Sequence, residues 1–95
     1  MIKASWNGKV VAESNECVEV EGNKYFSPKT VNMKYFKPTN EIYNCPWKGI
    51  CDYYDVVVDG KVSRQGAWVY KNPKPAAKEI KGRFAFWHGV KVTEE

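Results

Sequence analysis

The chain has 95 residues, of which 43% are hydrophobic, 15% aromatic and 27% charged, and its formal net charge is +4. This length predicts one domain over residues 1–95 with a single modest core, and the composition excludes a disordered chain. Acidic and basic residues are interleaved, so the mild positive excess indicates an ordinary mixed surface rather than a concentrated nucleic-acid-binding stretch.

Cysteine content and hydropathy indicate in which cellular compartment the protein is expected. The three cysteines, Cys17, Cys45 and Cys51, are too few and odd in number for a disulfide framework. The first residues lack the apolar core of a signal peptide, and no stretch of about 18 apolar residues could cross a membrane. These features predict a cytoplasmic protein with reduced thiols and no membrane partner.

Turn signals divide the first half of the chain into short segments. Asn7-Gly8 predicts a tight hairpin, because both residues tolerate positive φ. Ser27-Pro28 predicts the start of a helix, since a capping side chain precedes proline at the first helical position. The expected elements are strands over 3–6, 10–14, 17–21, 24–26 and 41–45, and a short helix over about 28–36.

The strongest predicted strand, residues 50–59, carries large side chains at both parities. A strand that is apolar on both faces is typical of the centre of a sheet, and Asp59-Gly60 predicts the hairpin that closes it. Gln65-Gly66 indicates a β-bulge in the following strand. Further strands are expected over 62–63, 67–70, 83–87 and 90–93, with a second short helix over about 75–81. The pattern predicts a compact, mainly β domain with two short helices.

The turn Cys45-Pro46-Trp47-Lys48-Gly49 places a thiol, a fixed proline, an indole, an ammonium and a flexible glycine side by side. It leads directly into the predicted central strand. If the protein has a functional site, we expect it at this turn and along this strand.

The same turn is the centre of a resemblance that covers nearly the whole chain. Together with Tyr53-Tyr54-Asp55-Val56, Ala67-Trp68-x-Tyr70 and Ile80-x-Gly82-Arg83-x-Ala85-Phe86-Trp87, it resembles the domain of unknown function 427 family. That family also carries a nucleotidyltransferase-like label. The resemblance implies a small, mostly bacterial, β-rich protein with tent-like or barrel-like antiparallel sheets, similar to those of a zinc-binding superfamily. It implies no assigned catalytic residues.

The spacing of the carboxylates and cysteines in the sequence gives little support for metal-dependent chemistry. Nucleotidyl transfer needs carboxylates that hold a divalent cation, but Asp55 and Asp59 would lie about 13 Å apart along a strand, and no glycine-rich phosphate loop occurs. Zinc sites favour Cys-x-x-Cys pairs, which are also missing. We therefore predict neither a metal site nor a cofactor, and the sequence leaves open whether the protein is an enzyme.

Two residues have both a structural and a chemical interpretation. Cys45 could be a nucleophile whose pKa Lys48 lowers and whose general base is His88, the only imidazole. Alternatively, it could simply pack at the start of a tight turn. Asp55 could be a buried acid in a cleft, or the partner of Lys48, Arg64 or Arg83 in a structural ion pair.

Our leading hypothesis is a small-ligand-binding domain whose pocket takes a nucleotide-like or anionic molecule. Aromatic and basic side chains could form a groove that stacks rings and pairs with anions; these are Trp47, Trp68, Trp87, Tyr53, Tyr54, Tyr70, Lys48, Arg64 and Arg83. The predicted ligand-binding residues are Cys45, Trp47, Lys48, Tyr54, Asp55, Trp68 and Arg83. Two alternatives are an enzyme acting on a nucleotide or phosphorylated metabolite, and an RNA-binding or protein-interaction module.

Overall fold

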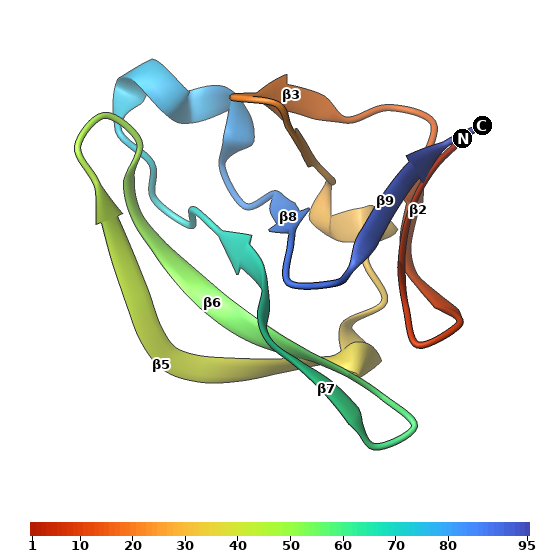
Figure 1. The fold of residues 1–95 in the computed structure, drawn as a ribbon. Helices are drawn as coiled ribbons and strands as arrows, with labels where there is room; N and C mark the ends of the chain where they lie inside the picture. The colour runs from red at the N-terminus through yellow and green to blue at the C-terminus, as the bar shows by residue number, and fades with distance from the viewer.

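The computed structural model describes residues 1–95 and contains three antiparallel sheets (Figure 1). Strands β1 (Ile2–Trp6), β2 (Lys9–Ser14) and β9 (Lys91–Glu94) form a sheet of order β2-β1-β9, and β3 (Val18–Val20) pairs with β4 (Asn23–Tyr25). The largest sheet has the order β5-β6-β7-β8, from β5 (Phe36–Cys45), β6 (Gly49–Val58), β7 (Lys61–Val69) and β8 (Phe84–Phe86). The predicted mainly β class is confirmed.

Strand β6 lies between β5 and β7, as the apolar side chains at both of its parities predicted. Asp59 and Gly60 join β6 to β7 with φ values of 49° and 77°, which is the predicted hairpin turn. The predicted bulge is also present, because Tyr54 pairs with Ala67 whereas Val56 pairs with Ser63.

The four-stranded sheet has buried side chains on both faces. Along β7, Ala67 and Val69 enter a first core that the β2-β1-β9 sheet covers, whereas Trp68, like Tyr70 just after the strand, enters a second core. Figure 1 shows the β2-β1-β9 sheet standing opposite the long strands β5, β6 and β7. The buried members of the second core are Tyr25, Cys45, Cys51, Trp68, Tyr70, Ala77, Ile80 and Ala85.

The helix predicted over about 28–36 is instead two separate 3₁₀ turns, η1 (Pro28–Thr30) and η2 (Met33–Tyr35). The start signal is confirmed, because the Ser27 side chain caps η1 ahead of Pro28. The segment fails to continue as a helix because Val31 is extended and bridges to Ala12 of β2. A β-branched residue that finds a strand partner and a core position gains more from extended structure than from another helical turn.

The second helical segment, η3 (Pro75–Ile80), is a short 3₁₀ segment at the predicted place. No helix of the protein is long and apolar enough to cross a membrane. Strand β5 begins at Phe36, earlier than the predicted start at residue 41, because Lys37 and Pro38 pair with β6. Pro38 is tolerated there because β5 is an edge strand of the sheet.

Candidate functional site

A cavity of about 380 Å³ lies on the second-core side of the four-stranded sheet. We call it the aromatic pocket, because five of its eight lining residues carry aromatic rings. Its lining residues are Asn23, Tyr43, Lys48, Cys51, Tyr53, Trp68, Tyr70 and Trp87. The register explains this gathering: Tyr43 pairs with Cys51 across β5 and β6, and Tyr53 pairs with Trp68 across β6 and β7.

Three rings form a fixed wall of the aromatic pocket. The rings of Tyr53 and Trp87 are parallel within 4° at a centroid distance of 6.1 Å, and Trp68 meets Trp87 edge-on at 5.2 Å. The Trp68 indole donates a hydrogen bond to the Tyr25 hydroxyl at 3.2 Å, which fixes its orientation. Such a wall offers flat, polarisable faces to a ligand ring.

The bulge in β7 holds Trp87 in place although that residue is 42% exposed. The backbone N–H of Trp87 donates to the Gly66 carbonyl at 3.0 Å, and its indole N–H donates to the Gln65 carbonyl. The next residue, His88, stacks on the Trp87 ring at 4.1 Å and contacts the Arg64 carbonyl through Nδ1. The backbone carbonyls of the bulge therefore fix the position of Trp87 in the wall of the aromatic pocket.

Lys48 brings a positive charge to the aromatic pocket from the β5–β6 turn. It is only 7% exposed, and its ammonium donates to Glu21 and lies 5.6 Å from the Tyr70 ring centroid. Burial is the largest single influence and lowers the pKa of Lys48. The hydrogen bond with Glu21 and the charge interactions with Tyr25, Cys45 and Glu21 together outweigh burial and raise this pKa above its usual value. Lys48 is therefore a fixed cation rather than a neutral amine nucleophile.

The thiols of the second core differ in their environments. Burial by itself raises the pKa of Cys45, but the backbone N–H groups of Lys48 and Trp47 and the charge of Lys48 together outweigh it and leave this pKa below its usual value. Burial raises the pKa of the Cys51 thiol, which lies beside the hydroxyls of Tyr53 and Tyr70. All three cysteines are free.

The tyrosines of the second core resist ionisation, and an alkaline titration should show it. Burial raises the pKa of Tyr53 to about 12 and raises the pKa of Tyr25 and Tyr70 as well. The unfolded chain ionises its tyrosines near pH 10. We therefore expect the phenolate absorbance of the folded protein at about pH 11 to fall short of the unfolded value, with Tyr53 and Tyr70 still protonated.

The same pKa shifts fix the sign of the pH dependence of stability. A tyrosine that keeps its proton in the folded state contributes stability below pH 10, and this contribution is lost as the pH rises above that value. Tyr53→Phe should remove one tyrosine from the absorbance deficit. A folded protein that ionises all six tyrosines together near pH 10 would contradict the buried hydroxyl cluster.

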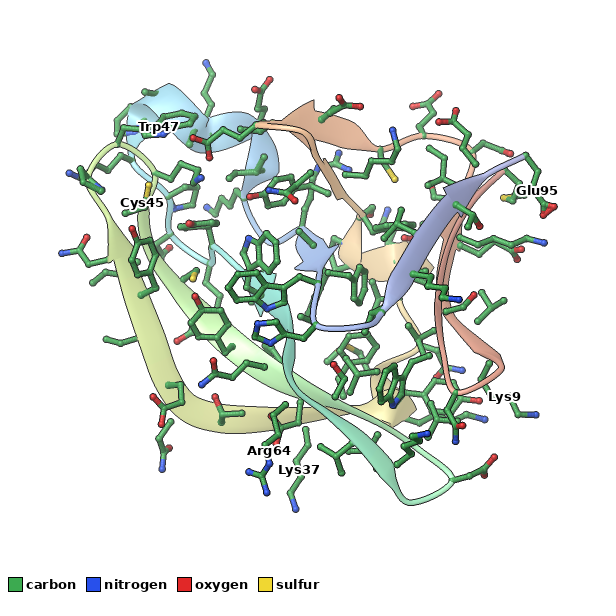
Figure 2. All side chains as sticks on the ribbon, viewed as in Figure 1. Lys9, Lys37, Cys45, Trp47, Arg64 and Glu95 are labelled. Atoms are coloured by element: carbon green, nitrogen blue, oxygen red, sulfur yellow. The ribbon has the colours of Figure 1, made fainter.

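Four of the predicted ligand-binding residues lie together. Lys48 and Trp68 line the aromatic pocket. Trp47 lies beside Lys48, with the ammonium 5.3 Å from its ring centroid, and Cys45 is buried in the second core at the same turn. Figure 2 shows Cys45 and Trp47 at the β5–β6 turn.

The other three predicted residues lie elsewhere. Tyr54 points into the first core, where its ring contacts Phe36 and Phe84. Asp55 accepts a hydrogen bond from the Gln65 backbone at 2.9 Å and lines a separate hollow. Arg83 precedes β8 and lies near Cys17, where burial raises the pKa of the thiol and the charge of Arg83 offsets part of that rise.

The separate hollow at Asp55 is larger, about 590 Å³, and more basic side chains line it. Its lining residues are Lys34, Tyr35, Phe36, Lys37, Asp55, Val57, Val62 and Arg64. Figure 2 places Lys37 and Arg64 side by side, far from the β5–β6 turn. No group of three or more His, Cys, Asp or Glu side chains is arranged to hold a metal ion.

Four residues at the aromatic pocket were not among the predicted binding residues or the predicted groove. Tyr43 and Cys51 could have been found from the pairing of β5 with β6, which places them on the face of Tyr53. Asn23 and Glu21 belong to the β3–β4 hairpin, whose position over this face depends on tertiary packing. Glu21 carries one local signal, since it occupies a turn position that favours asparagine.

Fold and pocket together define a small, mainly β domain with an aromatic pocket and a buried cation on one face of its largest sheet. The chain belongs to the family described as Domain of unknown function (DUF427), whose model matches residues 1–95. No curated protein matches the chain.

Proposed function

We propose that this protein binds a small, planar, nucleotide-like or anionic ligand in the aromatic pocket. The observation that carries the proposal is the ring wall of Tyr53, Trp68 and Trp87 beside the buried ammonium of Lys48. Stacking a ligand ring on an aromatic side chain contributes about 1–3 kcal/mol for a nucleobase. The cavity volume of about 380 Å³ falls within the range typical of small-molecule sites.

The polar groups of the aromatic pocket favour a ligand with a negative or hydrogen-bond-accepting end. Lys48 is the one formally charged residue of the lining, and it is positive. The side chains of Asn23, Tyr43 and Tyr70 add hydrogen-bonding groups around the rings. Such convergence of a few polar groups within an aromatic cavity is what orients a small ligand.

The placement of the predicted reactive groups favours binding over catalysis. Cys45 interacts with the backbone of Trp47 and Lys48, whereas His88 contacts Trp87 and Arg64. Lys48 and Asp55 line different cavities. A nucleophile and its base must lie within hydrogen-bond reach of each other. A single lining cation also suits a small ligand better than an extended RNA strand, which needs many phosphate contacts.

Titration with a chemically broad panel tests the proposal. The panel contains nucleosides, nucleotides, aromatic carboxylates and sugars, and intrinsic tryptophan fluorescence reports binding because Trp68 and Trp87 line the pocket. We expect saturable fluorescence changes with planar compounds and none with the sugars. No response to any compound, together with an experimental structure in which the rings close on one another, would refute ligand binding.

A further inference from the structure

Glu21 occupies a turn position that its backbone preferences do not explain. Glu21 and Gly22 join β3 to β4 with φ values of 54° and 79°. The Asn7-Gly8 and Asp59-Gly60 turns have the same pair of positive φ values with residues that suit them. Glutamate tolerates this conformation less well than asparagine or aspartate. The reason for glutamate at this position therefore lies in its side chain.

The Glu21 carboxylate contacts a different donor with each of its oxygen atoms. The Lys48 ammonium donates to Oε1, and the Trp47 indole N–H donates to Oε2 at 3.4 Å. The hydrogen bond with Lys48 is the main cause that lowers the pKa of Glu21, so the carboxylate is charged at neutral pH. Lys48 and Trp47 thus form a two-donor receptor for one carboxylate at the edge of the aromatic pocket.

The two partners of this ion pair differ in how far each side chain is buried. The Glu21 side chain is 51% exposed and can turn into water at the tip of its hairpin, whereas the Lys48 side chain is 9% exposed. A buried ammonium without an anion is strongly unfavourable, while a half-exposed carboxylate regains hydration when it is released. The exchange of Glu21 for another carboxylate would keep Lys48 paired.

We propose that Glu21 holds the position that a ligand carboxylate takes in the complex, and that the ligands of the aromatic pocket are small aromatic carboxylates. The ligand ring would stack on Tyr53 and Trp87, and its carboxylate would accept hydrogen bonds from Lys48 and Trp47. This inference rests on the proposed ligand-binding function and specifies its ligand class. One cation and one N–H match a monoanionic carboxylate, whereas a phosphate dianion would call for more donors.

Calorimetric titration of the full chain with indole-3-acetate and its neutral amide tests the exchange. For the wild type we expect the acid to bind about tenfold more tightly than the amide, because the acid can replace Glu21 at Lys48 and return the Glu21 carboxylate to water, whereas the neutral amide cannot. Lys48→Met should abolish this difference. The amide should bind both proteins with affinities within about twofold of each other, since ring stacking is retained.

Removal of the internal competitor gives the sharper readout. Glu21→Asn keeps a residue that suits the turn but cannot supply a carboxylate, and we expect it to raise the affinity for indole-3-acetate about tenfold. Glu21→Gln, which retains the side-chain length, should act in the same direction. The matched control is Glu19→Gln, which removes the same charge from the same hairpin, where Glu19 pairs with Lys24, and should leave the affinity unchanged.

The outcomes separate the inference from the function on which it rests. Equal binding of acid and amide to the wild type, or no gain in acid affinity for either Glu21 variant, overturns the carboxylate exchange but leaves ligand binding intact. A gain of the same size with Glu19→Gln also overturns it, because net charge alone would then explain the effect. If neither the two probes nor any planar compound of the panel binds, both proposals fail.

Discussion

Replacing Gly66 with alanine is expected to lower the free energy of unfolding by about 2–4 kcal/mol. A Cβ atom at this position would overlap the Ser63 hydroxyl oxygen and lie 2.9 Å from the Ser63 Cβ. Ser63 is buried and donates a hydrogen bond to the His88 carbonyl at 2.8 Å. Relief of the clash must break this hydrogen bond or shift the bulge.

Thermal or urea unfolding measures this effect, and a double-mutant cycle identifies its cause. Ser63→Ala alone should cost about 1 kcal/mol, the net value of one hydrogen bond. In the Ser63→Ala/Gly66→Ala protein the closest contact is gone, so the double variant should lose less stability than the sum of the two single variants. A Gly66→Ala protein as stable as the wild type would contradict the tight bulge geometry.

Trp87→Ala is expected to weaken the binding of planar ligands by about tenfold to a hundredfold, with a smaller effect on folding. One stacked ring contributes about 1–3 kcal/mol to the binding of a planar base, and each 1.4 kcal/mol corresponds to a factor of ten. Trp87 is 42% exposed as a residue, so less of its area contributes to the core than for a buried tryptophan. Calorimetry gives the affinity without relying on tryptophan fluorescence.

Tyr35→Ala is the matched control, because it removes an aromatic ring from the other large hollow. Tyr35 lies in η2, packs partly against the first core and lines the hollow that contains Asp55 and Arg64. We expect this variant to lose some stability and to keep the wild-type affinity. If Tyr35→Ala weakens binding and Trp87→Ala does not, the ligand site is the Asp55 hollow rather than the aromatic pocket.

The sequence contains most of the information for the sheets because turns and alternation are local. Asn7-Gly8 and Asp59-Gly60 determine two hairpins through their tolerance of positive φ, and residues 50–59 show a strand buried on both faces. The helix expected over about 28–36 was wrong because its local start signal is followed by Val31, which a distant strand draws into extended pairing. Cap residues cannot report such a tertiary contact.

The site was predictable only in part, for a similar reason. Trp47 and Lys48 share one turn, so their proximity follows from the sequence, and Trp68 lies opposite Tyr53 once β6 and β7 are paired. Tyr54 was expected near the pocket but points to the other face, since neighbouring residues of a strand alternate. Which face carries the pocket depends on where the β3–β4 hairpin packs, and Glu21 reaches Lys48 across 27 residues of sequence.

The crystal structure of the complex with the tightest-binding planar compound is the most direct test of the ligand site. We predict the ligand ring against Tyr53 and Trp87, with its negative or accepting group within hydrogen-bond distance of the Lys48 ammonium. A ligand bound in the hollow of Asp55 and Arg64, with the rings of the aromatic pocket unchanged, would contradict the proposed site.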